Sequence, residues 1–339
     1  MRAMAKTRSV HPPSAPLAFA LALAGCAASA APGVLLLPAV GRPTHVSVFG
    51  RVLREAPADG SSALSRNLRR LAARNWEGAP VEVSFLGRQV NVTSGHDGAF
   101  EAAFPAPAQE AFPVGVHVVK AKVPGAEAEA SVEVVSDAAP FLVISDFDDT
   151  VARSDIVSKA GMLRSGLLED GDTHPEIEGM AGFYRCLREG KQAAPGFAFV
   201  SGSPVQFGPR MQAFMAKHRV PPAAFYLRDL GPSTLSGYKQ PAIRALLSQF
   251  PEKVLLVGDN GEKDPEVYAQ IRDEFPGRVI QIYIRDAGGP GGAERVKGVL
   301  FSKAVDAAKD ALARGLISQA CLAREFPETS VDRAARQGL

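Results

Sequence analysis

Apolar runs alternate with amphipathic stretches along the second half of the chain. Five runs are almost wholly apolar, which is typical of strands that are covered on both faces. They span residues 141–145, 197–201, 224–229, 253–258 and 278–284. Helical periodicity covers approximately residues 177–189, 205–218, 241–250 and 265–275. Strands that alternate with helices predict right-handed crossovers and a parallel sheet with helices on both faces.

The first half of the chain has a different pattern. Short β-prone runs, several with apolar and polar alternation, lie between Val46 and about Val135, and turn-forming residues separate them. This pattern predicts a small antiparallel β-sandwich domain over residues 46–138. One amphipathic helix is expected at residues 62–76. Its arginines either attract anionic lipid headgroups or face solvent while its leucines pack on the sandwich.

The N-terminus has the features of a secretion signal. Basic residues precede the apolar run 16–25, which is too short to span a bilayer but fits the apolar part of a signal peptide. Residues 23–26, "LAGC", resemble the bacterial lipobox, so we expect a signal peptide over residues 1–26 that ends at Cys26, with lipid on that thiol. The expected location is the bacterial cell envelope, with the chain anchored to a membrane surface. The alternative is cleavage after Ala30, which yields a secreted or periplasmic soluble protein.

Composition changes this picture little. The 339 residues are enough for two domains, and 46% hydrophobic with 22% charged residues is typical of a folded globular protein. The net charge of +2 gives no reason to expect nucleic acid as a partner. A linker rich in Ala, Pro and Gly is expected over residues 27–45. We interpret Cys186 and Cys321 as small core residues, although an oxidising envelope also allows them to pair.

Polar residues gather after three of the predicted strands. A lysine, Lys239, precedes the fourth of these strands. The candidate site residues are Asp146, Asp148, Ser201, Gly202, Lys239, Asp259 and Asp264. The carboxyl ends of parallel strands meet at one edge of a sheet, so these groups should share one crevice. Carboxylate oxygens at this density need a hard cation, and Mg²⁺ typically uses one or two of them together with a substrate phosphate. Beside such charges one aspartate can attack phosphorus while another moves the leaving-group proton.

The order of these motifs resembles that of the haloacid-dehalogenase phosphatase superfamily. The matching segments are "DFDDT", "FVSGS", Lys239 and "GDNGEKD". Longer stretches, including "HPEIEGMAGFYRCL" and "SGSPVQFGPRMQAFM", resemble the catalytic domain of the actin-patch phosphatidate phosphatase family and its bacterial relatives. The resemblance implies a haloacid-dehalogenase-like α/β catalytic domain, a Rossmannoid parallel sheet, over residues 139–292. The gaps between the motifs leave no room for a large cap, and residues 293–339 are expected to form a C-terminal helix and tail.

The resemblance also implies which residues are catalytic. Asp146 corresponds to the nucleophile and Asp148 to the general acid and base. Ser201 corresponds to the residue that binds a phosphoryl oxygen. Gly202, where family members often have a different polar residue, is expected to contribute to the same phosphate-binding segment. Lys239 corresponds to the lysine that neutralises the charge developing on the phosphoryl group.

Mg²⁺ is the cofactor that the resemblance implies. Asp146, Asp259 and the main-chain carbonyl of Asp148 correspond to its ligands. Asp264 either completes the metal shell or orients Lys239, and the sequence leaves both roles open.

The expected function is Mg²⁺-dependent hydrolysis of a phosphomonoester through an aspartyl-phosphate. A crevice without a large cap is open to a bulky substrate such as a phospholipid headgroup, and the resemblance implies hydrolysis of phosphatidate to diacylglycerol and phosphate. The alternatives are a phosphatase of phosphoproteins or of other bulky phosphomonoesters, and a non-catalytic envelope lipoprotein that binds a partner. Motif order excludes a phosphoacceptor receiver domain, whose acidic pair precedes its phosphorylated aspartate.

Overall fold

The computed structural model describes most of the chain after residue 30. The described residues are 31–57, 69, 71–108, 110–153, 175–189, 193–229 and 235–327. The expected signal peptide with its lipidation site Cys26, and most of the helix expected at 62–76, lie outside these residues. Among the described residues, no helix is both long enough and apolar enough to cross a membrane.

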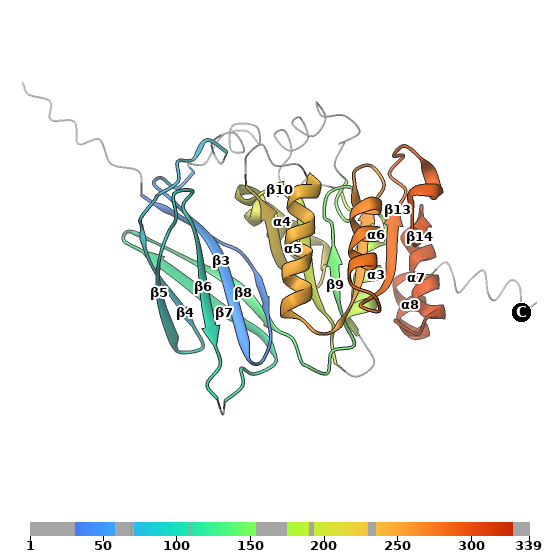
Figure 1. Cartoon of the computed structure of the whole chain (residues 1–339), viewed down its shortest axis with the longest axis horizontal. Helices are drawn as coiled ribbons and strands as arrows, with labels where there is room; N and C mark the ends of the chain where they lie inside the picture. The colour runs from blue at the N-terminus through green and yellow to red at the C-terminus, as the bar shows by residue number, and fades with distance from the viewer. Residues whose placement is uncertain are drawn as a thin grey trace, which may run out of the picture. The chain divides into compact units, whose positions relative to one another are not determined.

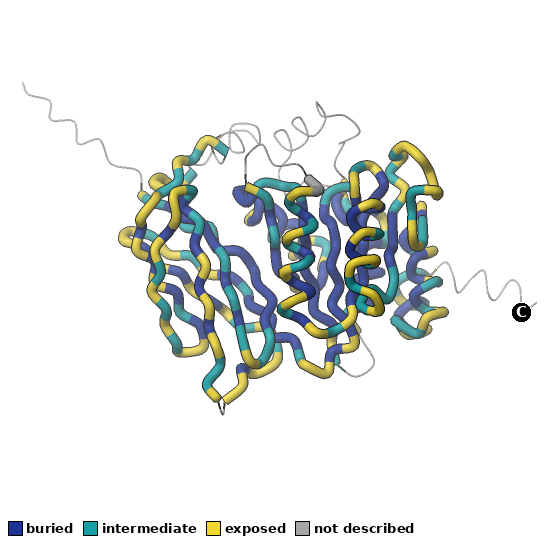
Figure 2. Tube along the Cα trace, in the orientation of Figure 1, coloured by how far each residue is buried: buried dark blue, intermediate teal, exposed yellow. Residues whose placement is uncertain are grey.

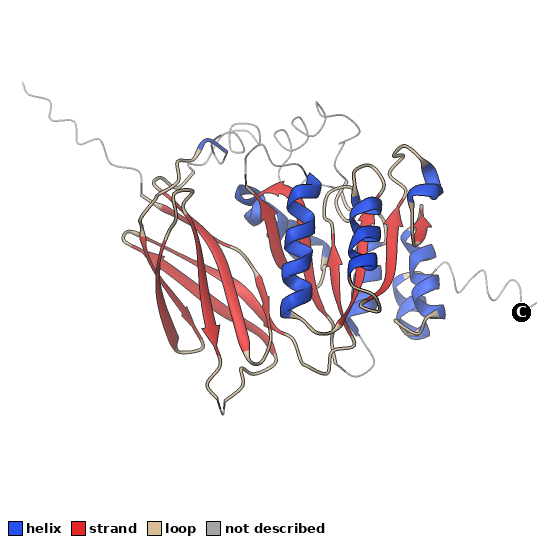
Figure 3. Cartoon of the chain, in the orientation of Figure 1, coloured by secondary structure: helices blue, strands red, loops and turns tan. Residues whose placement is uncertain are grey.

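A six-stranded sheet dominates the second half of the chain, and every neighbouring pair of its strands is parallel (Figures 1 and 3). Its strands are β9 (Phe141–Ser145), β10 (Gly196–Pro204), β11 (Ala224–Arg228), β12 (Lys253–Asp259), β13 (Val279–Arg285) and β14 (Val299–Phe301). The first five coincide with the five apolar runs. The α/β class predicted from the alternation of strands and helices is therefore confirmed.

The order of the strands creates a switch point in the middle of this sheet. Across the sheet the order is β11-β10-β9-β12-β13-β14, so the chain moves outward from β9 in one direction and then from β12 in the other. In sheets of this order, ligands bind outside the carboxyl ends of the strands, at the point where the direction reverses. That point lies between β9 and β12.

Helices cover both faces of the parallel sheet. They are α3 (Met180–Glu189), α4 (Gly208–His218), α5 (Leu235–Gln249), α6 (Asp264–Glu274), α7 (Ala304–Ala313) and α8 (Gln319–Glu325), with short 3₁₀ turns at η1 (Val205–Phe207) and η2 (Gly292–Arg295). On β9, Phe141 and Val143 pack in one core with α3, α4, α7 and α8, whereas Leu142 and Ile144 pack in another with α5 and α6. Strand β9 is buried along its whole length for this reason (Figure 2).

Two further sheets precede the parallel one. The three-stranded sheet has the order β1-β3-β6 and the five-stranded sheet has the order β2-β8-β7-β4-β5; all their pairs are antiparallel except β2 with β8. Their strands are β1 (Gly33–Leu36), β2 (Ala39–Gly41), β3 (His45–Leu53), β4 (Pro80–Phe85), β5 (Arg88–Thr93), β6 (Ala99–Pro105), β7 (Gly115–Val123) and β8 (Ala126–Val134). Inward residues of both sheets, such as Val48 on β3 and Val83 on β4, share one hydrophobic core.

The prediction of a linker over residues 27–45 is wrong for residues 31–45, which the structure describes. Gly33–Leu36 and Ala39–Gly41 are strands, and Leu36 and Ala39 belong to the core of the two antiparallel sheets. Ala, Pro and Gly dominate this stretch of sequence, but it also contains larger apolar side chains. Burying these side chains stabilises the strands by more than the conformational entropy that a flexible linker would keep.

The sheet also extends beyond the boundary predicted at residue 292. β14 pairs with β13, and the single helix expected after residue 301 is divided into α7 and α8. Gly315, with φ of 70°, turns the chain between the two helices, and the Ser318 side chain caps α8 by accepting a hydrogen bond from the Cys321 amide. Helix α5 begins at Leu235 rather than at Pro241, so Lys239 lies within the helix and not at its start.

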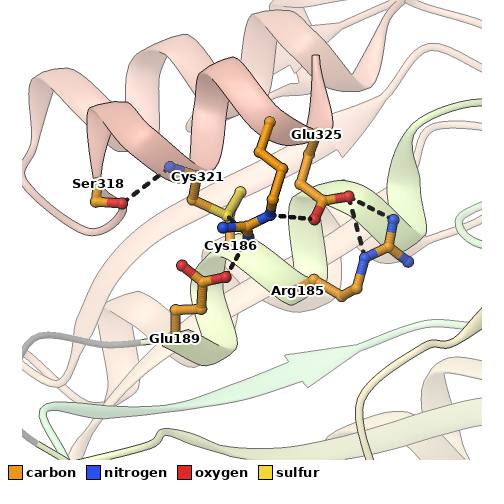
Figure 4. Close-up of a disulfide and its surroundings, with 7 residues drawn as sticks. Arg185, Cys186, Glu189, Ser318, Cys321 and Glu325 are labelled. Carbon is orange, nitrogen blue, oxygen red and sulfur yellow. Dashed lines mark hydrogen bonds and ion pairs between the residues drawn. A yellow bond between two sulfur atoms is a disulfide. The ribbon is translucent and has the colours of Figure 1, made fainter. Parts of the chain in front are cut away.

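Cys186 on α3 and Cys321 on α8 form a disulfide, with Cα atoms 5.5 Å apart (Figure 4). Their interpretation as small core residues is confirmed, and the pairing that the sequence left open is present. Both are fully buried, and ion pairs flank them: Arg185 binds Glu325, and Arg324 binds Glu189. The sequence separation of 135 residues explains why the sequence alone left the pairing open.

Candidate active site

The candidate residues occupy the carboxyl edge of the parallel sheet. Asp146 and Asp148 follow β9, Asp259 ends β12 and Asp264 begins α6. The amide of Asp146 donates to the carbonyl of Val257 at 2.9 Å, which ties the loop after β9 to β12 across the switch point. The fold thus brings together residues that are more than a hundred positions apart in the sequence.

Three carboxylates form a tight buried cluster at this edge. Asp146, Asp259 and Asp264 each present an oxygen within 4.8 Å of the others, and all three side chains are buried. The ammonium of Lys239, which is 2% exposed, lies 3.0 Å from Asp146 Oδ1 and 2.6 Å from Asp264 Oδ1. With all three carboxylates ionised, the single ammonium would leave two negative charges uncompensated.

Burial controls the charge state of this cluster. It raises the pKa of Asp146 well above its ordinary value, although the Lys239 ammonium opposes the shift. Burial, followed by repulsion from Asp264, raises the pKa of Asp259 to about 7. Burial lowers the pKa of Lys239, but attraction to Asp146 and Asp264 outweighs it and the pKa lies well above its ordinary value. Two buried carboxylates that resist ionisation, with oxygen as the donor atom throughout, fit a hard divalent cation such as Mg²⁺.

Gly258 allows β12 and α6 to approach closely at the cluster. A Cβ atom at this position would lie 2.4 Å from Asp264 Oδ2 and 2.8 Å from Cε2 of Tyr268. The Tyr268 hydroxyl in turn donates to the Val257 carbonyl at 2.9 Å, which fixes α6 against the strand. Glycine is therefore required sterically at this point of the motif.

The loop after β9 is tightly wound. The carbonyl of Phe147 accepts hydrogen bonds from the amides of Val151 and Ala152, at 2.9 and 3.2 Å. Asp149 has φ of 53°, a left-handed conformation that Asp adopts more readily than most residues. Thr150 is fully buried, and its hydroxyl donates to Asp259 Oδ2 at 3.4 Å. The loop thus fixes the main chain on either side of Asp148.

The Asp148 side chain contacts β10. Its Oδ2 atom accepts hydrogen bonds from the hydroxyls of Ser201, at 3.1 Å, and Ser203, at 2.6 Å. Gly202 lies between the two serines, where the register of β10 against β11 shifts between Ser201 and Pro204. Irregular strand ends of this kind are common beside active sites. The structure thus brings the side chains of Asp146, Lys239, Asp259 and Asp264 together, with Asp148 and Ser201 forming an adjacent pair.

Two residues beside the site were not singled out from the sequence. Ser203 contacts Asp148, and a carboxylate oxygen of Glu262 lies 3.9 Å from the Lys239 ammonium. Both belong to recognised motifs, "FVSGS" and "GDNGEKD". Ser203 lies two residues after Ser201, which places both side chains on one side of an extended strand; this spacing was the available signal.

The second half of the chain is similar to a known enzyme family. Residues 141–286 match the family model described as the catalytic domain of phosphatidate phosphatase APP1. Phosphatidate phosphatase APP1 of Saccharomyces cerevisiae is 26% identical over 219 residues, which cover 60% of this chain and 32% of the yeast protein. Uncharacterized protein C29B5.04c of Schizosaccharomyces pombe is 30% identical over 153 residues, which cover 42% of this chain and 25% of that protein. The chain thus spans about a quarter to a third of the length of these curated relatives.

Likeness to solved structures is weak. A chain of the Pnkp1/Rnl/Hen1 complex is 16% identical with a TM-score of 0.33, over 44% of this chain and 47% of that chain. The carbohydrate acetylesterase XAC1771 of Xanthomonas citri is 16% identical with a TM-score of 0.30, over 83% of this chain and 66% of that chain. Neither likeness carries an argument about this chain.

Proposed function

We propose that this chain is a Mg²⁺-dependent phosphomonoesterase that acts through an aspartyl-phosphate on Asp146. The observation that carries the proposal is the buried cluster of three carboxylates and Lys239 at the switch point of the parallel sheet. The match of residues 141–286 to a phosphatidate phosphatase catalytic domain supports the same activity. We also assign the parallel sheet to the haloacid-dehalogenase-like class and the two antiparallel sheets to a β-sandwich, on their strand order and shared core.

The first step is attack by a carboxylate oxygen of Asp146 on phosphorus. The ester P–O bond breaks, its electron pair stays on the leaving oxygen, and that oxygen takes a proton from Asp148. Asp148 suits this role because it lies two residues after Asp146 in the same loop and its carboxylate is held by hydrogen bonds from two serines of β10. The products of this step are the released alcohol and an aspartyl-phosphate on Asp146.

The second step regenerates the nucleophile. Asp148, now ionised, takes a proton from water as the water oxygen attacks phosphorus, and the bond between phosphorus and Asp146 breaks. Inorganic phosphate leaves, and Asp146 is again a carboxylate. One residue thus serves as the acid in the first step and the base in the second.

Charged and polar groups of the site stabilise the phosphoryl group. Lys239 supplies a buried positive charge that Asp264 holds in place at 2.6 Å, so we assign Asp264 to orienting Lys239. Ser201 and Gly202 are assigned to binding a phosphoryl oxygen. Asp146, Asp259 and the carbonyl of Asp148 would hold Mg²⁺, whose charge reduces the repulsion between an anionic nucleophile and an anionic phosphate.

The proposed substrate is phosphatidate, hydrolysed to diacylglycerol and phosphate. Similarity to a yeast phosphatidate phosphatase supports this assignment. We further propose that Cys26 carries the lipid and that the protein works on a membrane surface of the cell envelope. The disulfide supports an oxidising compartment, because such bonds rarely persist in reducing ones. Palmitate labelling of the wild-type chain, and not of Cys26→Ser, is the expected result; equal labelling would refute the anchor.

The proposed activity is tested by phosphate release from phosphatidate in mixed micelles, with and without Mg²⁺. We expect release that depends on Mg²⁺ and that Asp146→Asn reduces by at least about a thousandfold, since the amide is not a nucleophile. Phosphopeptides serve as the comparison substrate. Preference for the peptides would overturn the lipid assignment, and equal rates for the wild-type and Asp146→Asn proteins would overturn the phosphatase assignment.

A further inference from the structure

Two serine hydroxyls converge on one oxygen of the Asp148 carboxylate. Ser203 Oγ donates to Asp148 Oδ2 at 2.6 Å and Ser201 Oγ donates to the same atom at 3.1 Å. The amide of Ser203 also donates to Ser201 Oγ at 3.0 Å. Among the described residues, no hydrogen bond is made by the other oxygen of Asp148, Oδ1.

Ser201 cannot serve both of its assigned partners at once. A serine hydroxyl has a single proton to donate. If Ser201 donates this proton to a phosphoryl oxygen of the substrate, its hydrogen bond to Asp148 is lost. The hydroxyl of Ser203 is then the group that keeps Asp148 in place during the reaction.

We propose that Ser203 is a positioning residue that holds the Asp148 carboxyl toward the leaving oxygen while Ser201 binds the phosphoryl group. The inference rests on the proposed function, because Asp148 acts as the general acid there. The Ser203 hydroxyl occupies Oδ2, so Oδ1 remains available to carry the proton. That proton passes to the leaving oxygen as the P–O bond breaks, and the electron pair of the bond stays on the leaving oxygen.

Local sequence explains why Ser203 reaches Asp148. Ser201 and Ser203 both lie on β10, where alternate residues project to the same side of an extended chain. Pro204 follows, with φ of −59°, and a residue before proline is biased toward extended conformations. The proline therefore limits the backbone freedom of Ser203 and keeps its side chain on the Asp148 side.

The role of a general acid depends on the leaving group, which provides the test. A 4-nitrophenolate ion leaves readily without a proton, whereas the alkoxide of a lipid or an alkyl phosphate requires one. The full chain with Ser203→Ala is compared with wild type on 4-nitrophenyl phosphate and on phosphatidate in mixed micelles. Because Asp148 is also the base in the shared second step, the comparison uses the first step alone, measured as pre-steady-state release of diacylglycerol or 4-nitrophenolate. We expect this rate to fall by about 10- to 100-fold for phosphatidate and by less than about threefold for 4-nitrophenyl phosphate.

Two further variants separate positioning from general structure. Ser203→Thr keeps the hydroxyl on a side chain suited to a strand, so it should restore the first-step rate for phosphatidate to within about threefold of wild type. Ser203→Cys keeps the size but donates a weaker hydrogen bond, so it should behave like Ser203→Ala and replaces it if the alanine variant does not fold. Ser201→Ala should instead slow both substrates alike, because it removes a phosphoryl contact that both need.

The outcomes distinguish the inference from the activity on which it rests. Equal loss of the first-step rate on the two substrates in Ser203→Ala, or no recovery in Ser203→Thr, would overturn the positioning role while leaving the phosphatase assignment intact. Absence of Mg²⁺-dependent hydrolysis of both substrates by the wild-type chain would overturn the proposed function itself.

Discussion

Lys239 places a positive charge among three buried carboxylates. Its ammonium contacts Asp146 and Asp264 directly and has an oxygen of Glu262 at 3.9 Å. A buried ion pair contributes little net stability when it is complete, but removing one partner leaves an uncompensated charge in a medium of low dielectric constant. The effect of the lysine on stability should therefore depend on whether another cation is present.

Replacing Lys239 with methionine should separate these contributions. In the absence of divalent cations, Lys239→Met should lower the free energy of unfolding by about 3–5 kcal/mol, and Mg²⁺ should recover part of the loss. Activity with Mg²⁺ should fall by at least about a hundredfold. Urea unfolding with and without Mg²⁺ measures the first effect, and phosphate release measures the second. Lys253→Met, at an exposed lysine, is the control; the account fails if both variants behave alike.

At the residue scale, the sequence identified the charges of the site but not all of its hydrogen bonds. Asp146, Asp259 and Asp264 were predicted to converge because each follows a parallel strand, and strand ends meet at one edge. Ser203 was not assigned a role, although its position two residues after Ser201 on an extended strand was the available signal. Glu262 was missed because it is one of four residues between Asp259 and Asp264, and spacing alone does not say which of the four turns inward.

At the element scale, the strands that are buried on both faces were the easiest to predict. The strand β14 has only three residues, so its apolar pattern was too short to distinguish from a loop. Strands β1 and β2 were hidden by the Pro and Gly around them. Helix α5 begins six residues before Pro241, because tertiary packing of the helix outweighs the hydrogen bond that an internal proline removes.

The disulfide between α3 and α8 ties the C-terminal helix to the rest of the α/β sheet. Closing a loop of 135 residues restricts the unfolded chain, and the chain-entropy model gives a stabilisation of about 5 kcal/mol for loops of this size. Because both cysteines are fully buried, a mild reductant should not reach the bond in the folded protein.

A double variant, Cys186→Ala with Cys321→Ala, should therefore lower the unfolding midpoint markedly. A loss of about 2–5 kcal/mol is expected, with little change in activity at 25 °C, because neither cysteine contacts the residues of the candidate active site. Urea unfolding of the oxidised protein and of the double variant gives the comparison. An unchanged free energy of unfolding would mean that the bond does not form in solution.

At the scale of the whole molecule, the carboxylate cluster makes stability depend on both pH and metal. The pKa of Asp259 is raised from 3.8 to about 7, and that of Asp146 is also raised. In this range the metal-free folded state binds more protons than the unfolded state. The stability that the protonated Asp259 carboxyl contributes is complete below the pKa of the unfolded state, near 4. It is lost as the pH rises through the pKa of the folded state, near 7.

Metal-free protein should therefore become less stable between pH 4 and pH 7, by roughly 4 kcal/mol from Asp259. Mg²⁺ should remove most of this slope, because a bound cation favours the ionised carboxylates. Urea unfolding at several pH values, with EDTA or with Mg²⁺, measures both effects, and Asp259→Asn should flatten the metal-free slope. Identical slopes with and without Mg²⁺ would argue against a cation at the cluster.

The central claim is that Asp146 becomes phosphorylated during turnover. The most direct measurement is rapid acid quenching of the wild-type chain during hydrolysis of ³²P-labelled phosphatidate, followed by peptide mapping of the label. The account predicts that ³²P from the substrate appears as acid-stable label on the peptide that contains Asp146. It predicts no label on that peptide in Asp146→Asn. Steady hydrolysis without label on that peptide, or label on Ser201 instead, would contradict it.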